Sequence, residues 1–408
     1  MRNKYLLLIL SLLTLVSTSI VAQSSAYGRY GYGELMTPSF SASKGMGGVG
    51  IGIRDGLVVN TQNPASYSDV DSLTFLFDVG VYLRSGEYSA GDGAKSSNLN
   101  GNLDYLAMKF RLARNIGMSL GMTSYSRADY SYGFSGEEQG VSYVQQFIGR
   151  GGLARVYAGV GATLFDHLSL GVNVGYLFGE PQHINKTSTG GDPIFRSEGI
   201  HVNAVQLETG LQGTIPVGRY ETLTLGAYFS PDLSFDADYY WIKTVAKDTT
   251  LIPEKDRHVV FQQPLSYGFG ASYKYKKNLT VAADFLHQGW ADTEFVGQTD
   301  SLQNRMRFAL GAEYCPDPKG RSYVERMKYR LGANYSNSYY NIEGAGTSTY
   351  GVSLGFSFPL MDLRSTASLT LEYIRVQPQL KSMITENYFQ VSVGYTLNEL
   401  FFFKRKIE

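Results

Sequence analysis

The chain has very few of the residues on which disulfide frameworks, metal clusters and nucleic-acid binding depend. Cys315 is the only cysteine among 408 residues, so neither an intrachain disulfide nor a cluster of cysteine ligands can form. The 36 basic side chains are balanced by 36 acidic ones, whereas a nucleic-acid-binding protein needs a basic surface. The five histidines are scattered, without an HxxxH pair. We therefore expect no metal, no cofactor, no catalytic site and no nucleic-acid partner.

Long apolar runs are scarce as well. The one apolar stretch near the start, residues 5–16, follows Arg2 and Lys4 and precedes small residues that end at Ala22. This order is typical of a secretory signal peptide, which we place at residues 1–22. No later run reaches the roughly 18 apolar residues of a membrane-spanning helix. An exported chain without such a helix is either soluble or a closed β-barrel, in which every backbone polar group is paired within the sheet.

Glycine and aromatic residues are plentiful, with 46 Gly, 31 Tyr and 22 Phe against only 12 Pro, which favours many strands. Residues 350–360 read Y-V-L-F-F-L at one parity and G-S-G-S-P at the other. Residues 72–84, 168–178 and 389–398 alternate in the same way. Such segments place apolar side chains toward lipid and small or polar ones toward a wet interior. A secreted β-sandwich also has alternating strands, but it would not sustain this parity for more than 300 residues.

Weaker copies of the pattern bring the number of predicted strands to 14. They lie near residues 103–113, 116–134, 141–165, 198–216, 222–243, 258–276, 279–296, 303–315, 327–342 and 366–378. Short connections alternate with longer ones, such as 86–100, 180–197 and 246–257, as expected for periplasmic turns and outer loops. The sequence therefore predicts an all-β, antiparallel transmembrane barrel over residues 71–403. Both chain ends are predicted to be periplasmic, and residues 404–408 would form a basic tail there.

Residues 23–70 lack alternation and are rich in glycine. They contain Gly45, Gly47, Gly48 and Gly50, followed by the run 63–65. A stretch of this kind is either a flexible tail or a compact insert packed by close backbone approach. The spacing Gly45-x-Gly47-x-x-Gly50 formally matches a dinucleotide fingerprint, but no βαβ unit surrounds it.

Here the sequence resembles the FadL family of outer-membrane transporters. The resemblance is carried by the segment 43–50, by Asn63-Pro64-Ala65 just before the first strand, and by the run 151–179. It implies a 14-stranded barrel whose amino-terminal segment, residues 23–70, folds into the lumen as a hatch. It also implies passage of long-chain fatty acids or other hydrophobic compounds, with sideways release through a kinked strand.

The kink of the family lies in an early strand, whereas the candidate interruption here is Gly149-Arg150-Gly151-Gly152 in the fourth. Those glycines are also consistent with an ordinary wall bulge. Inward parity places a set of charged residues in the lumen. These candidate lumen charges are Asp78, Arg84, Lys109, Arg111, Arg155, Glu208, Asp284, Arg307, Glu313, Arg330 and Glu372. They either fix the hatch through ion pairs and hydrogen bonds or hold the carboxylate of a ligand.

The sequence thus predicts an exported, monomeric outer-membrane barrel of a Gram-negative cell, in contact with membrane lipid, that admits fatty-acid-like hydrophobic compounds by passive diffusion. Two alternatives remain open at this point. One is a barrel of the same family that serves as a docking subunit in protein secretion and transports nothing. The other is a closed structural barrel. An apolar pocket above the hatch would favour transport, and a filled interior would favour the alternatives.

Overall fold

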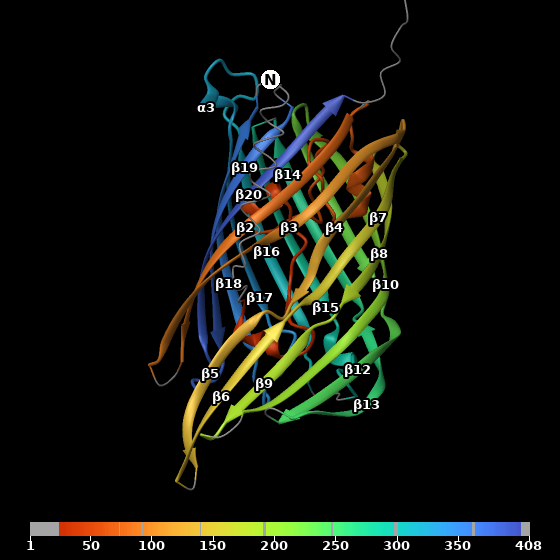
Figure 1. Ribbon diagram of the computed structural model, residues 1–408. Helices are drawn as coiled ribbons and strands as arrows, with labels where there is room; N and C mark the ends of the chain where they lie inside the picture. The colour runs from red at the N-terminus through yellow and green to blue at the C-terminus, as the bar shows by residue number, and fades with distance from the viewer. Residues whose placement is uncertain are drawn as a thin grey trace, which may run out of the picture.

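The structure is a computed structural model that describes residues 24–400, apart from 73, 91–92, 139, 191–192, 246–247, 277, 298–300 and 361–363. The predicted signal peptide, the aromatic residues 401–403 and the basic tail lie outside the described residues. Within them, no helix is long and apolar enough to cross a membrane. The dominant feature is one antiparallel sheet in which the first long strand pairs with the last, so that the sheet closes (Figure 1).

Fourteen strands form this closed barrel, as predicted. Nine are continuous, and five are interrupted once and therefore carry two labels each: β4 with β5, β6 with β7, β8 with β9, β11 with β12, and β13 with β14. The bounds are β2 (Thr74–Ser89), β3 (Lys95–Ala113), β4 (Ile116–Arg127), β5 (Tyr130–Glu138), β6 (Val141–Arg150), β7 (Gly152–Leu164), β8 (Leu168–Gly179), β9 (Gln182–Ser188), β10 (Ile194–Gly218), β11 (Glu221–Ser230), β12 (Leu233–Val245), β13 (Asp248–Gln263), β14 (Ser266–Tyr275), β15 (Leu279–Gln288), β16 (Arg305–Tyr314), β17 (Lys328–Asn337), β18 (Thr347–Pro359), β19 (Thr366–Pro378) and β20 (Thr385–Leu400).

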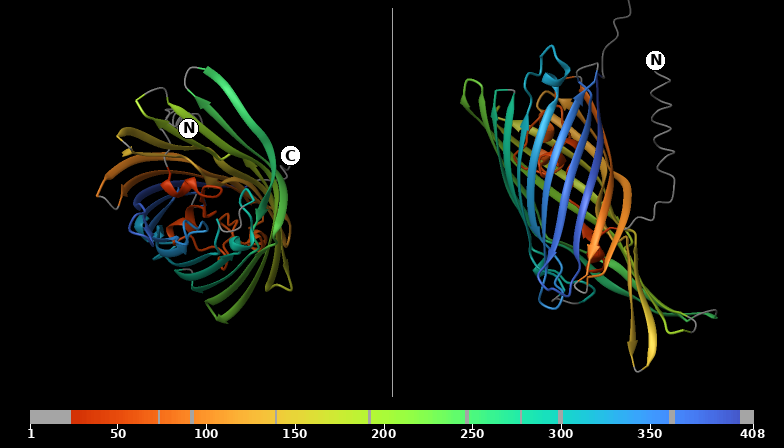
Figure 2. Two further views of the ribbon diagram at one scale, coloured as in Figure 1. Left: turned by 90° about the horizontal axis from the view of Figure 1, so that it is seen from below. Right: turned by 90° about the vertical axis from the view of Figure 1, so that its left-hand side faces the viewer.

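The three long loops expected from the sequence are wrong in extent, because most of each is strand. β2 continues to Ser89 and β3 begins at Lys95, while β9 and β13 occupy much of the other two connections. Beyond the membrane both faces of a strand meet water, so alternation no longer marks it. At this end β5, β6, β9, the first part of β10, β12 and β13 continue the wall as a sheet that projects beyond the barrel, which we call the extension (Figures 1 and 2).

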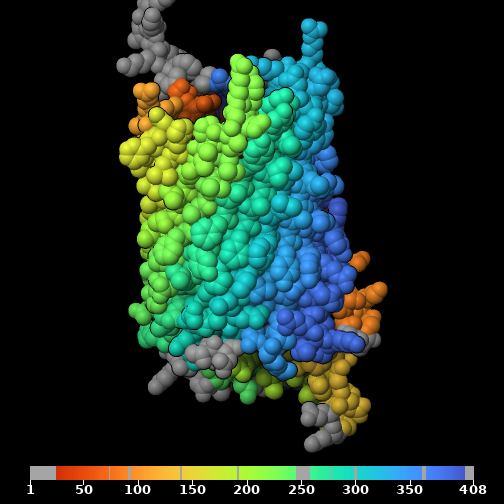
Figure 3. Space-filling view, turned by 180° about the vertical axis from the view of Figure 1, so that it is seen from behind, coloured from red at the N-terminus to blue at the C-terminus, as the bar shows by residue number. Residues whose placement is uncertain are grey.

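The outer surface of the barrel is apolar. Leu354, Leu310 and Phe269 are about half exposed on this surface. Exposed aromatics gather near the short turns, as at Tyr220 and Tyr275, and toward the opposite end of the strands. Figure 3 shows the far side as a continuous wall. A closed barrel with an apolar, aromatic-bordered surface is the form in which strands span a lipid bilayer.

Residues 24–71, which we call the inner segment, run through the bore (Figure 2). They contain η1 (Ala26–Arg29), β1 (Glu34–Leu35), α2 (Ser41–Gly45) and η2 (Pro64–Ser68). The segment starts at the end that carries the extension, where Ser24 donates to the carbonyl of Asp129, and leaves at the opposite end to join β2. Two other short helices, η3 (Trp290–Asp292) and α3 (Tyr323–Arg326), lie in connections between strands.

Candidate functional site

The inner segment packs directly against the backbone of the barrel wall. On ten strands an inward-facing glycine lies at the contact, and a Cβ added there would come less than 3.0 Å from an atom of the inner segment. We call this set the glycine ring. Its members are Gly117, Gly161, Gly171, Gly210, Gly226, Gly268, Gly270, Gly311, Gly332, Gly355 and Gly394, with two of them on β14. A wall without side chains at this level lets two backbones approach, so the bore is filled here by the chain itself.

The predicted hatch residues lie at these contacts. Gly47 and Gly48 have φ angles of 69° and 79°, in the left-handed region that glycine adopts readily. Gly47 faces Gly332, and Gly45 faces Gly355. The run 63–65 opens η2, where the Asn63 side chain caps the helix and donates to the carbonyl of Ile51 over 2.8 Å. The sequence left this stretch as either a flexible tail or a compact insert packed by close backbone approach, and it did not indicate which strands the stretch would meet.

Buried charges hold the backbone of the inner segment at two levels. The Asp284 carboxylate accepts from the amides of Gly50 and Ile51 over 2.5 and 2.8 Å. Nearer the short turns, the fully buried ammonium of Lys109 donates to the carbonyls of Asp55, Val58 and Asp69 over 3.2, 3.1 and 2.9 Å. Charged groups make the stronger hydrogen bonds in a protein, so both residues fix the segment to the wall.

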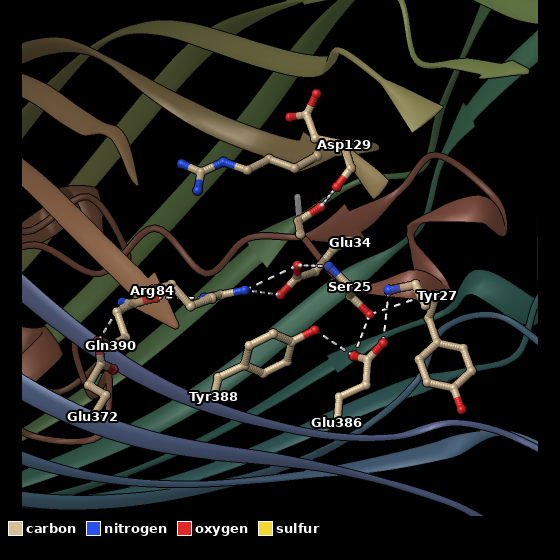
Figure 4. Close-up of polar contacts among 12 residues, drawn as sticks. Ser25, Tyr27, Glu34, Arg84, Asp129, Glu372, Glu386, Tyr388 and Gln390 are labelled. Atoms are coloured by element: carbon tan, nitrogen blue, oxygen red, sulfur yellow. Dashed lines mark hydrogen bonds and ion pairs between the residues drawn. The ribbon is translucent and has the colours of Figure 1, made fainter. Parts of the chain in front are cut away.

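A third set of contacts, which we call the outer anchor, holds the start of the inner segment (Figure 4). The Glu386 carboxylate accepts from the Ser25 hydroxyl, the Ala26 amide and the Tyr388 hydroxyl, over 2.7, 2.8 and 2.7 Å. Beside it, Arg84 donates to Glu34 over 2.9 Å and to Gln390 over 2.9 Å. These contacts join β2 and β20 to the inner segment where those two strands close the barrel.

Arg84 also sets the charge state of its partner. Burial alone would raise the pKa of the Glu34 carboxyl, but the guanidinium of Arg84 beside it holds that pKa below its ordinary value. Glu34 is therefore ionised at neutral pH, and the pair keeps its attraction within the bore.

The inner segment also completes the wall. Pairing between β3 and β4 stops at Tyr105 and Thr123, and beyond that point β3 pairs only with β2. There β1 takes the free edge of β4, with Leu35 opposite Ser126 and Glu34 opposite Arg127. Two residues of the inner segment thus occupy a seam between two barrel strands, which a movement of the segment would uncover.

The predicted wall bulge lies elsewhere, at the junction between barrel and extension. Gly149 is near the end of β6, Gly151 separates β6 from β7, and Gly152 begins β7. Gly151 has a φ of 77° and Gly152 one of 151°. The neighbouring strands are interrupted at the same level, between β4 and β5 and between β8 and β9. The three interruptions together turn the extension away from the barrel.

Most of the predicted lumen charges are on the inner face of the wall. Asp78, Arg84, Lys109, Arg155, Glu208, Asp284, Arg307 and Arg330 are buried, while Glu313 and Glu372 are partly buried beside Arg330 and Gln390. Arg155 pairs with Glu208 over 2.6 Å, and Arg330 with Glu313 over 2.7 Å. Arg111 differs, because it donates to the carbonyls of Ala113 and Arg114 and stays at the end of the barrel that carries the short turns.

Sequence reasoning missed several charged residues of the bore. Asp104 pairs with Lys44 in the bore, although the alternation of β3 would place it on the outer face. The reason is that β2 and β3 shift register between Gly80 and Val81. Glu34 belongs to a segment without periodicity, and Glu386 precedes the alternating run by which β20 was found. A GxSxG sequence occurs at 351–355, but Ser353 lies within β18 and bonds the backbone of Gly45 and Gly47. In hydrolases this motif forms a turn between a strand and a helix, and Ser353 is not on such a turn.

Aromatic side chains close the bore above the glycine ring. Tyr27 stacks on Tyr340 with ring centroids 5.6 Å apart, and Tyr32 meets Phe261 edge-on at 4.8 Å. Trp290, from η3, is completely buried against Tyr339. These residues belong to the largest cluster of buried apolar side chains, which extends to inward residues of β7, β8, β10, β13 and β19. Above the glycine ring the bore is therefore closed by a largely apolar cluster, which lies beside the charged contacts of the outer anchor.

A cavity of about 180 Å³ lies between this aromatic cluster and the glycine ring. Its lining includes Tyr27, Tyr339 and Tyr388 together with Arg305 and Arg307. Arg307 donates to the carbonyls of Gly47 and Gly48, over 2.7 and 3.3 Å, and Arg305 donates to Gln288 over 3.2 Å. Neither guanidinium has a carboxylate within 4.0 Å among the described residues. The same lining holds the carboxylates of Glu34, Asp104 and Glu372, so the cavity is bordered by tyrosine rings and by charges of both signs.

A family model described as BamG matches residues 1–408, the whole chain. The chain belongs to the BamG family. Its fold is also that of FadL-type outer-membrane barrels. A Pseudomonas aeruginosa FadL homologue matches with a TM-score of 0.61 and 11% identity, over 89% of this chain and 99% of that one. The Ralstonia pickettii toluene transporter TbuX gives 0.57 and 14%, over 88% and 98%.

The monoaromatic hydrocarbon channel CymD matches with a TM-score of 0.56 and 15% identity, over 88% of this BamG-family chain and 97% of its own. At such identities the likeness establishes the fold alone. No curated protein matches the chain. Among the described residues, no group of three or more His, Cys, Asp or Glu side chains is placed to hold a metal ion.

Proposed function

We propose that this barrel admits hydrophobic compounds through the outer membrane by passive diffusion, with the inner segment acting as its hatch. The observation that carries this proposal is the aromatic, largely apolar cluster that closes the bore above the glycine ring. A channel for polar solutes has a wet, polar interior, whereas apolar side chains around a few polar groups are the lining of a hydrophobic ligand site. The seam covered by β1 supports sideways release once the segment moves.

Within this proposal, long-chain fatty acids are the substrate class. Arg305 and Arg307 supply two guanidinium groups to a cavity that tyrosine rings also line, and a guanidinium binds a carboxylate well. A fatty acid carries both the chain and the head group that such a cavity suits. Replacing Arg305 with Met should lower uptake of a long-chain fatty acid and leave uptake of toluene, which has no charge, unchanged. Equal loss of both would contradict the role of the cation.

A disulfide between the inner segment and the wall tests the hatch. A Cβ added to Gly394 would lie 3.0 Å from the Ser41 Cβ, close to the roughly 3.5–4.5 Å of a disulfide. In a Cys315→Ser background, the S41C/G394C protein should take up solute only after reduction. The single S41C variant should be active with or without reductant. Full uptake by the oxidised double variant would refute the hatch.

A second function is favoured by how completely the bore is filled. Two cavities that border the inner segment above the glycine ring measure about 180 and 80 Å³, below the roughly 300–1,000 Å³ of ligand sites. Meanwhile the extension presents apolar side chains, with Phe134, Val141 and Val144 each about half exposed. These features suit a docking subunit in protein secretion.

Replacing Phe134, Val141 and Val144 with Ser tests this second function. The change should release a co-purifying partner, whereas Tyr323→Ser with Val324→Ser, at exposed positions on the opposite end, should not. If deletion of the protein leaves fatty-acid uptake unchanged and the triple variant loses its partner, docking is the function. If the triple variant releases the partner and the cells still grow as wild type does under conditions in which growth depends on that partner, docking is not the function.

A further inference from the structure

A hollow lies on the outside of the barrel. It measures about 510 Å³ and lies on the lipid-facing wall across β3, β4, β7, β8 and β10. The register aligns Leu106, Met122, Val156, Tyr176 and Val205 in one row across these strands. A second row, one step nearer the short turns, has a small residue, Ala158, between Leu120 and Val174. Because Ala158 is short and its neighbours are longer, the surface is recessed at Ala158.

Polar side chains border this hollow on one side only, toward the extension. On the outward face of β10, Val205 is followed by Asn203 and then His201. Asn203 accepts from the Tyr176 hydroxyl over 3.0 Å, and its amide nitrogen lies 2.9 Å from His201 Nε2. Glu180 is 3.8 Å from the other nitrogen of His201. We call these four residues, Tyr176, Glu180, His201 and Asn203, the rim cluster.

The rim cluster is exposed, with 49% of the His201 side chain and 35% of the Glu180 side chain accessible. Asn203 lies two residues beyond Val205, which corresponds to about 7 Å along a strand. The wall therefore changes from apolar to hydrogen-bonding within the length of a lipid head group. Flat barrel walls contact acyl chains on one side, whereas a concave wall surrounds a chain and makes more of the dispersion contacts that hold it.

We propose that this hollow binds one acyl chain of an outer-membrane lipid, whose polar head group hydrogen-bonds to the rim cluster. The inference requires only that the barrel lies in a bilayer and is independent of what passes through the bore. Contact between water and an apolar hollow is unfavourable. In the membrane, the apolar molecule that contacts this hollow is a lipid acyl chain. A phospholipid and a lipopolysaccharide both combine acyl chains with a hydrogen-bonding head, and both satisfy this chemistry.

The experiment uses the full-length protein extracted in a mild detergent and stripped of lipid in steps, with the remaining lipid weighed by native mass spectrometry. Wild type should keep one lipid after the others have left, and its mass should identify a phospholipid or a lipopolysaccharide. Ala158→Trp fills the centre of the hollow and should lower the retained occupancy about tenfold. Ala333→Trp, at an exposed lipid-facing alanine on β17, is the matched control and should not.

Asn203→Leu provides a second variant, which removes the head-group contact without filling the hollow. It should also lower lipid occupancy, while leaving the melting temperature close to that of wild type because its side chain is exposed. Equal lipid retention in wild type and Ala158→Trp would overturn the proposal. So would loss of lipid from Ala333→Trp as well, or a second protein retained at this face in place of a lipid. Uptake assays do not enter this test, so its failure is separate from failure of the hatch.

Discussion

Adding one methyl group to the glycine ring should loosen the inner segment. At Gly332, on β17, a new Cβ would meet the amide nitrogen of Gly47 and the carbonyl carbon of Met46. Both atoms belong to the backbone, so no side chain can rotate away to make room. Overpacking of this kind costs about 1–3 kcal/mol. Because the clash exists only while the segment is seated, the ratio of displaced to seated segment in Gly332→Ala should rise about 5- to 150-fold.

The change can be measured by cysteine labelling. In a Cys315→Ser background, Ser43→Cys places a thiol in α2, where the native side chain is only 3% exposed. Its rate of reaction with a polar maleimide then reports how often the segment leaves the wall. Gly213→Ala is the matched control, since a Cβ at Gly213 would have no atom within 4 Å. The reasoning is refuted if Gly332→Ala labels at the wild-type rate, or if Gly213→Ala speeds labelling equally.

Two further perturbations act on the polar contacts of the segment. Lys109→Met removes the donor to three carbonyls and leaves these carbonyls buried without it, at a cost of about 1–3 kcal/mol or more. Proteolysis within residues 55–69 should therefore become faster. Lys95→Met, at an exposed position of the same strand, is the control and should leave the rate of proteolysis unchanged. The pKa of the Glu34 carboxyl is lower in the folded protein than in the unfolded chain, where it is about 4.3. The ionised carboxylate therefore stabilises the fold fully above about pH 4.3. This stabilisation is lost as the pH falls from about 4.3 through the lower pKa of the folded protein. The difference in melting temperature between wild type and Glu34→Gln should therefore shrink on acidification, and a constant difference would exclude the Arg84 pair as its source.

The barrel could be predicted from the sequence because the bilayer imposes a period of two on every strand that crosses it. In residues 350–360 that period is free of errors, and the structure places all but the last of them in β18, with Val352 and Leu354 outward. The extension could not be predicted in the same way. Residues 95–98 of β3 are polar at both parities, because outside the membrane neither face is selected for lipid.

The candidate site was only partly within reach of the sequence. Parity placed Asp284 and Lys109 on the inner face, but their partners are backbone groups of the inner segment, which leave no trace in side-chain patterns. The glycine ring did have a signal, because Gly171, Gly332 and Gly394 occupy inward positions within strands that otherwise carry polar side chains there. Asp104 was out of reach, since one shift in register reverses parity for the residues around it.

The close fit at the glycine ring constrains the order in which the protein assembles. The inner segment is tied to β2 at one end and touches ten other elements of a wall that has no spare room. A finished cylinder of this shape would offer the segment no entrance wide enough for α2 and η2 together. The sheet must therefore curl around a segment that is already in position, and the joining of β2 to β20, beside Ser25 and Glu34, is the step that seals it inside.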